Sequence, residues 1–219
     1  MTYHIGVVAH TSRCEQAHRL AETVGAVYLS MDDGTLGCEA SHRKVWDRLY
    51  EMDPRADHCV VLEDDAIITD SFRQQLDMVL TAAPTPIVSL YRGHNVNNRA
   101  FETNGLLATG RADTENAHWV TAPHLLHAVG VAIRTELVPD MLTHIGPLPD
   151  KFPIDERISH WAKTVKQQIS YCHPSIVDHA DGATAILTHH RRDKLPRPQG
   201  RVAYQYGTRD MWNSEAVKL

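Results

Sequence analysis

The sequence predicts an α/β fold with one core and a ligand site at the end of one strand. Apolar runs of strand length alternate with segments of helical periodicity through the first two-thirds of the chain. Acidic residues directly follow one of those runs, where open α/β sheets build ligand sites. The length of 219 residues suits one core, because a chain of that size can bury roughly 70% of its unfolded surface.

Periodicity assigns the individual elements. In the first half the expected strands are Ile5–Ala9, Ala26–Ser30, Cys59–Glu63 and Ile87–Tyr91, and the expected helices are Glu15–Val24, Ala40–Met52 and Phe72–Leu80. In the second half the expected strands are Trp119–Ala122, Ala128–Ile133 and Ile176–Asp178, and the expected helices are Thr135–Thr143 and Asp155–Lys166. Residues 92–118 are polar and lack periodicity, so we predict a long functional or mobile loop there.

Composition narrows the class of protein. The net charge of −5 does not indicate a nucleic-acid binder, and the four cysteines have neither zinc-knuckle nor disulfide spacing. No apolar stretch is long enough to span a membrane, and the first residues read as a strand, so we expect a cytoplasmic protein. No feature indicates an obligate protein partner. We expect a single domain over 1–190 and an irregular, basic tail over 191–219 that packs on or near the site.

The strongest chemical signal is the run Glu63-Asp64-Asp65 after an apolar strand. Glu63 and Asp65 share a side if the strand continues, and Asp64 projects the other way unless the chain turns. Crowded carboxylates repel each other, which favours a cation between them, and Mg²⁺ or Mn²⁺ prefers such hard oxygen ligands. An acidic turn at a strand end is the plain alternative.

A second signal is the segment 34–46, in which Gly34 and Gly37 precede a helix containing His42. Glycines there let the backbone approach a ligand, and a helix N-terminus favours anions. A simple glycine turn is the alternative reading.

These motifs, taken in order, resemble glycosyltransferase family 25. The shared pattern is Gly-x-x-Gly-Cys-x-x-Ser-His-x-x-x-Trp at 34–46, a strand ending Leu-Glu-Asp-Asp-Ala at 62–66, the strand at 128–133 and Pro-Ile-Asp at 153–155. The resemblance covers residues 3–180 and implies a GT-A fold, with a Rossmann-like nucleotide half merged with an acceptor half. It also implies a UDP-type nucleotide-sugar donor, a Mn²⁺ or Mg²⁺ ion, and inversion at the anomeric carbon.

Residues 172–182 depart from that family. The run Pro-Ser-x-Val-Asp-His-x-Asp-Gly is more similar to small glycosyltransferases of actinobacterial phages, some of which are linked to DNA base hypermodification. This resemblance implies DNA carrying 5-hydroxymethylcytosine as the acceptor, and the host cytoplasm as the location.

The resemblance assigns roles to the residues that match. Asp65, with Glu63 or Asp64, would bind the metal, and His179 is the candidate histidine ligand. Asp155 is the expected general base and Glu156 the runner-up. The expected donor contacts are Thr11, Ser12, Arg13, Gly37, His42 and Asp64.

The expected acceptor contacts are aromatic, imidazole and basic side chains, namely Tyr91, Trp119, His124, His127, Arg191 and Arg192. Trp119 is more typical of a core residue than of a platform, and the basic run 189–201 is more typical of a solvated loop than of a phosphate-contacting arm. Two other functions stay open. One is the same chemistry on a cell-envelope saccharide, and the other is a non-catalytic module that binds nucleotide or DNA.

Overall fold

The computed structural model describes residues 1–94, 98–149, 152–180 and 200–219. Eight of its strands form one mixed sheet in the order β10-β6-β8-β5-β7-β3-β1-β2, and β4 and β9 pair separately. The strands are β1 Tyr3–His10, β2 Tyr28–Asp32, β3 His58–Glu63, β4 Ala66–Ile68, β5 Ile87–Ser89, β6 Trp119–Ala122, β7 Gly130–Arg134, β8 Ile169–Cys172, β9 Val177–His179 and β10 Ala216–Lys218. The helices are α1 Cys14–Val24, α2 Cys38–Met52, α3 Phe72–Ala82, α4 Arg99–Glu115, α5 Val138–Ile145 and α6 Ile154–Thr164, with short 3-10 turns at Thr11–Arg13 and Thr135–Leu137.

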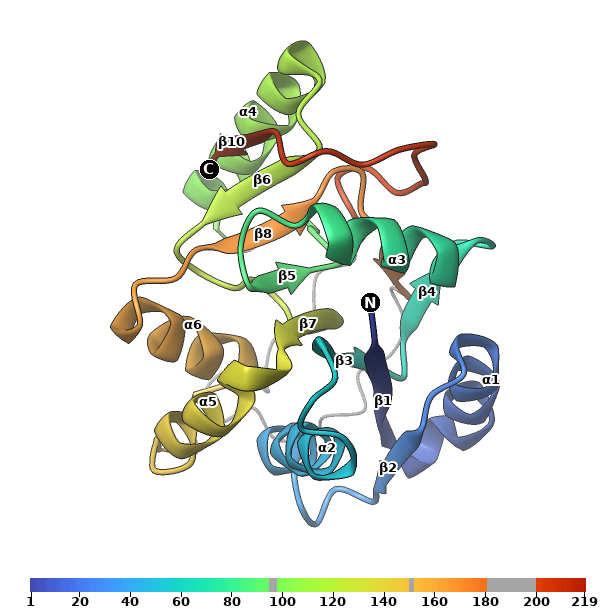
Figure 1. Cartoon of the computed structure of the whole chain (residues 1–219). Coiled ribbons are helices and arrows are strands. Elements are labelled where there is room, and N and C mark those ends of the chain that lie inside the picture. Colours follow the sequence, from blue (N-terminus) through green and yellow to red (C-terminus); the bar gives the residue numbers. More distant parts are fainter. Residues whose placement is uncertain (95–97, 150–151, 181–199) are drawn as a thin grey trace.

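Helices cover both faces of the sheet (Figure 1). Alternate strand residues point to opposite faces, so Cys59 and Val61 of β3 join one apolar cluster and Val60 and Leu62 join the other. The first cluster includes side chains of α2, α4, α5 and α6, and the second includes those of α1 and α3. The predicted α/β class, a mixed sheet flanked by helices, is confirmed.

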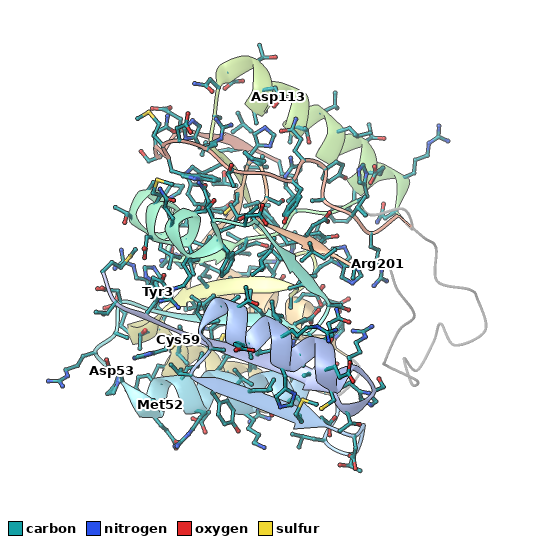
Figure 2. All side chains as sticks on the ribbon, turned by 90° about the vertical axis from the view of Figure 1, so that its right-hand side faces the viewer. Tyr3, Met52, Asp53, Cys59, Asp113 and Arg201 are labelled. Carbon is teal, nitrogen blue, oxygen red and sulfur yellow. The ribbon has the colours of Figure 1, made fainter. Side chains whose placement is uncertain are left out.

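The strands β1, β2 and β3 are parallel, and this arrangement positions the site. Their pairing sets His10 beside Asp32 and Val8 beside Glu63, so three carboxyl ends share one edge of the sheet. The antiparallel strand β7 begins at that edge, because Gly130 pairs with Leu62. In Figure 2, Tyr3 at the start of β1 lies on one side of the molecule and Arg201 on the other.

The predicted loop over residues 92–118 is wrong for its larger part, because α4 occupies Arg99–Glu115. The Asn98 side chain accepts hydrogen bonds from the backbone N–H groups of Ala100 and Phe101 and so caps the helix start. Only Gly105, Ala108 and Ala112 are buried. A helix that buries such small residues shows little apolar periodicity, which is why its sequence does not reveal it.

The last residues complete the main sheet. β10 pairs in parallel with β6, and the Trp212 side chain is buried beneath the sheet beside Trp119. The expectation of an irregular tail is therefore wrong at 216–218, where an edge strand forms. The domain boundary near residue 190 falls outside the described residues and stays a prediction.

Among the described residues, none of the helices is long and apolar enough to cross a bilayer.

Candidate active site at the carboxyl edge of the sheet

Arg13 lies between two of the three acids that follow β3. Its Nη1 donates to Asp64 Oδ1 and to Asp65 Oδ2, each at 2.7 Å. The backbone N–H of His10 also donates to Asp64 Oδ2, at 2.8 Å. Asp64 and Asp65 thus face the turn that follows β1, and a guanidinium relieves their mutual repulsion.

Burial acts on both carboxylates, with different net results. It raises the pKa of Asp64 despite the hydrogen bonds from His10 and Arg13. Burial also works against the Asp65 anion, but the hydrogen bond and charge of His179, together with Arg13, outweigh it and lower the pKa of Asp65. Asp65 is therefore the better-stabilised anion of the two.

His179 reaches Asp65 through the small sheet of β4 and β9. Ala66 pairs with His179 in that sheet, which sets the imidazole beside the neighbouring residue Asp65, and Nε2 lies 3.4 Å from Oδ2. The backbone N–H of Ala180 donates to the Asp65 carbonyl at 2.9 Å and fixes the turn. Burial lowers the pKa of His179, but its contact with Asp65 and the charge of Glu63 raise it overall.

The pair formed by Asp65 and His179 fits a divalent cation. Asp65 Oδ1 and His179 Nδ1 are buried without a hydrogen-bond partner among the described residues. The atoms that face each other are Asp65 Oδ2 and His179 Nε2, at 3.4 Å, and these would be the donors to an ion, although Oδ2 also accepts from Arg13. The carboxylate of Asp65 is the kind of ligand that Mn²⁺ and Mg²⁺ prefer.

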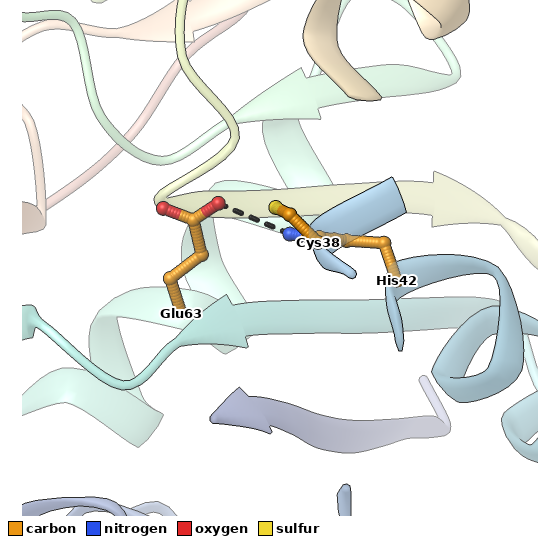
Figure 3. Close-up of side chains that lie close together, drawn as sticks. All are labelled: Cys38, His42 and Glu63. Atoms are coloured by element: carbon orange, nitrogen blue, oxygen red, sulfur yellow. Dashed lines mark hydrogen bonds and ion pairs between the residues drawn. The ribbon is translucent and has the colours of Figure 1, made fainter. Parts of the chain in front are cut away.

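Glu63 turns away from the other two acids. Its Oε1 lies 3.0 Å from Nε2 of His42, a buried residue of α2, and the Cys38 sulfur is close to both (Figure 3). The chain turns directly after Glu63, so the continuing strand on which a shared side for Glu63 and Asp65 depended does not form. Asp64 and Asp65 share Arg13 instead.

The expected donor contacts fall into two groups. Thr11, Ser12 and Arg13 form the 3-10 turn after β1, at the same edge as the acids, and Thr11 and Ser12 are exposed. Gly37 precedes α2 with φ of 84°, but Asp32 Oδ2 accepts its N–H at 3.0 Å, so that amide is not free for a phosphate. His42 is 1% exposed, and its Nε2 contacts Glu63. Its side chain is therefore not positioned to contact the nucleotide-sugar directly.

Asp155 opens α6 and faces the start of β7. Its Oδ2 accepts the backbone N–H of His127 at 3.0 Å, and its charge acts on the half-exposed Cys38. Glu156 is exposed on the outer side of the same helix turn. The structure thus brings Asp155 to the edge that carries the acids.

Tyr91 connects the two candidate histidines of the site. Its ring centroid lies 5.9 Å from that of His127 and 6.2 Å from that of His179. His127 has a φ of 65°, and its Nε2 is buried without a partner among the described residues. Burial lowers the pKa of His127 to about 4, so the imidazole is neutral at pH 7. A neutral imidazole of this kind can hydrogen-bond a hydroxyl group.

Other expected acceptor contacts lie elsewhere. Trp119 is fully buried in β6 and donates to the Asn213 carbonyl at 2.6 Å, so it belongs to the core and cannot serve as a platform. His124 is exposed and lines a cavity of about 150 Å³ beside Phe101 of α4. Arg191 and Arg192 lie outside the described residues.

Two residues beside the site, Arg201 and Cys38, were not among the expected contacts. Arg201, part of the basic run, accepts a hydrogen bond from the Tyr91 hydroxyl at its carbonyl, and its charge acts on His127 and His179. Cys38 joins His42 and Glu63, and the signal that could have found it is its i,i+4 spacing to His42.

One protein-family description matches part of the chain. The family described as glycosyltransferase family 25 (LPS biosynthesis protein) matches residues 16–107, fewer than half of the 219, and that segment contains α2 and all three acids. No curated protein matches the chain in sequence.

Similar solved structures are distant. One is the crystal structure of A197 from STIV, with 10% identity, a TM-score of 0.46 and coverage of 82% of this chain and 86% of that one. A second is a glycosyltransferase involved in glycosylation of the major capsid of PBCV-1, with 10% identity, a TM-score of 0.35 and coverage of 74% and 76%. A third is the inositol-1-phosphate CTP transferase from T. maritima, with 8% identity, a TM-score of 0.36 and coverage of 78% and 66%. These scores carry no argument about function. With the family match, the predicted enzyme class is confirmed, and the chain is a glycosyltransferase.

Proposed function

We propose that the chain transfers a sugar from a UDP-type nucleotide-sugar to a hydroxyl acceptor, using Mn²⁺ or Mg²⁺ held by Asp65 and His179. The observation that supports this most directly is their convergence. The two residues are far apart in the sequence, yet their side chains lie 3.4 Å apart, and Asp65 Oδ1 is buried without a partner in the described chain. A divalent cation at such a site neutralises charge on a leaving diphosphate.

The remaining donor contacts follow from position. Arg13 carries a positive charge at the end of β1, where Thr11 and Ser12 offer hydroxyl groups to a nucleotide. Asp64 holds both Arg13 and the His10 amide, so it fixes this turn relative to β3. Asp64 would therefore serve donor binding by positioning Arg13.

Asp155 would take the proton of the acceptor hydroxyl. A general base must lie within hydrogen-bond reach of that oxygen, and Asp155 faces the shared edge whereas Glu156 points outward. Asp155→Asn should lower the transfer rate by about 10²- to 10⁴-fold. Glu156→Gln is the matched control and should retain most of the rate.

For the acceptor, we propose 5-hydroxymethylcytosine in DNA. The support is the likeness of the segment around His179 to phage enzymes, together with the basic run that leads to Arg201 beside the site. Tyr91, His124 and His127, with Arg191 and Arg192, would contact a base that has left the duplex stack and its phosphates.

A nucleoside assay tests this proposal. Purified protein, Mn²⁺ and a panel of UDP-sugars are incubated with hydroxymethylcytosine DNA, which is then digested to nucleosides for mass spectrometry. We expect a mass gain of one sugar on hydroxymethylcytosine that is lost in Asp65→Asn. Absence of any gain across the donors would contradict the DNA acceptor.

A cell-envelope saccharide is the second candidate acceptor, because the matching family is described as containing LPS biosynthesis proteins. The same donors offered with saccharide acceptors in place of DNA distinguish the two. A non-catalytic binding module would instead bind UDP or DNA equally well with and without Mn²⁺, and would release no UDP.

A further inference from the structure

Three potential metal ligands of different chemical kinds meet beside the proposed donor site. Cys38 Sγ, His42 Nε2 and the Glu63 carboxylate all lie within 4.8 Å of one another. Figure 3 shows the cysteine sulfur and the imidazole nitrogen directed toward the glutamate. Among the described residues, these three side chains form a cluster that is compact enough to hold an ion.

The local fold explains why these side chains converge. Cys38 and His42 are four residues apart at the start of α2, so they share one face of the helix. Glu63 ends β3, and α2 packs against β1 and β3, which brings that face over the strand end. His42 is buried, whereas Glu63 and Cys38 are partly exposed, so an ion can enter from solvent.

We propose that Cys38, His42 and Glu63 form a zinc-binding site, separate from the divalent-cation site of Asp65 and His179. Thiolate, imidazole and carboxylate are the ligands of tetrahedral Zn²⁺, and three protein ligands leave a fourth position open to water. Mg²⁺ and Mn²⁺ prefer oxygen-rich sites, so the soft sulfur distinguishes this cluster from its neighbour.

A catalytic cysteine is the competing interpretation of the same residues. A nucleophilic thiol needs a lowered pKa, but burial, and then the charge of Glu63, raise the pKa of Cys38 well above its usual value. Zinc binds the thiolate form of cysteine, so binding at Cys38 would release the thiol proton.

Cobalt substitution tests the site by a readout other than activity. Co²⁺ bound by a thiolate gives an intense near-ultraviolet charge-transfer band. We expect this band when Co²⁺ is added to the metal-free protein, its loss when Zn²⁺ is then added, and its absence in Cys38→Ser. Zn²⁺ should also raise the melting temperature of the wild type but not of Cys38→Ser, because a ligand of the folded state stabilises it.

The chain provides a matched control in Cys14 and His18, which have the same i,i+4 spacing on α1 and lie 3.5 Å apart. Cys14→Ser should keep the full band. Glu63→Gln should keep the band but weaken Co²⁺ binding about 10-fold or more. A wild type without the band, or a Cys38→Ser protein that retains it, would overturn the proposal.

The two proposed metal sites can be tested independently. Asp65→Asn should lose Mn²⁺-dependent UDP binding and keep the cobalt band, whereas Cys38→Ser should show the reverse pattern. The zinc site does not rest on the proposed sugar transfer, so either result stands without the other.

Discussion

Arg13 determines how the acids after β3 are stabilised. From sequence, the three adjacent carboxylates suggested a cation between them as the relief of their repulsion. In the structure, Arg13 contacts Asp64 and Asp65, and His42 contacts Glu63. The proposed metal therefore has to be argued from the convergence of Asp65 and His179 rather than from repulsion.

Removing this guanidinium should be costly. Arg13→Gln leaves two largely buried carboxylates without their cation, and breaking a buried ion pair in this way costs about 3 kcal/mol or more. Urea unfolding at pH 7 measures the loss. Arg19→Gln, which removes an exposed partner of Glu15, should change stability by less than about 1 kcal/mol. Equal effects of the two variants would contradict this account of Arg13.

For single residues, the sequence predicted which residue types form the site better than it predicted their contacts. The acidic run lies at the carboxyl edge of the sheet, as the strand-end argument expects. Trp119 is a core residue. The sequence could not exclude an acceptor role for it, because no pattern distinguishes a buried indole from an exposed one. The turn after Glu63 was one of two alternatives that the sequence left open, because it depends on β4 pairing with β9.

Among the elements, β3 makes stability depend on pH through its first residue. His58 is 1% exposed, and burial together with the charge of Arg134 lowers its pKa to about 4. In the unfolded chain this histidine has a pKa of about 6.5, so between pH 6.5 and 4 it is protonated in the unfolded state but not in the folded state. Stability should therefore fall as pH drops from 6.5 to 4, by at most about 3 kcal/mol.

A variant isolates that contribution. His58→Leu cannot take up a proton, so its free energy of unfolding should decline less steeply between pH 6.5 and 4 than that of the wild type. Urea titrations at several pH values measure both slopes. Parallel slopes would show that His58 is not the group responsible.

The contact between β1 and α2 depends on a glycine. A Cβ at Gly6 would lie 2.4 Å from Val45 Cγ1 and 3.3 Å from Leu49 Cδ1. Gly6→Ala should therefore destabilise the protein by about 1–3 kcal/mol through overpacking. Gly110→Ala on α4 meets nothing within 4 Å and should stabilise it by up to about 1 kcal/mol. Thermal unfolding compares them, and shifts of the same sign would contradict the packing described.

Elements were predictable where periodicity was strong. The segments that became β1, β3, α2 and α3 show clear apolar patterns, and the structure confirms them. α4 was missed because it buries small residues, and the short strands β4, β8 and β10 were missed as well. Such short strands form through pairing with distant partners, which a local pattern cannot show.

For the whole molecule, the described C-terminal segment stabilises both the sheet and the neighbourhood of the site. Trp212 is 8% exposed and donates to Gln75 of α3, while the Ala203 N–H donates to Asp178 beside His179. The sequence predicted the α/β class from alternation, but the return of the chain to the sheet is a long-range event that alternation does not encode.

Trp212→Ala should cost about 3–5 kcal/mol, because it leaves a cavity between α3 and the sheet. Met211→Ala is the adjacent control: Met211 is 68% exposed, and its truncation should have little effect. Thermal unfolding at one pH compares both with the wild type. A Trp212→Ala protein as stable as Met211→Ala would mean that the C-terminal segment does not contribute to the core.

The central claim is that Asp65 and His179 hold a divalent cation that binds the diphosphate of the donor. Calorimetric titration of UDP into the protein, with and without Mn²⁺, tests it directly, using His179→Gln and the matched variant His173→Gln, whose histidine pairs with Asp113 away from the acids. We predict that Mn²⁺ tightens UDP binding at least 10-fold in the wild type and in His173→Gln, but not in His179→Gln. Equal UDP affinity with and without Mn²⁺ in the wild type would contradict the claim.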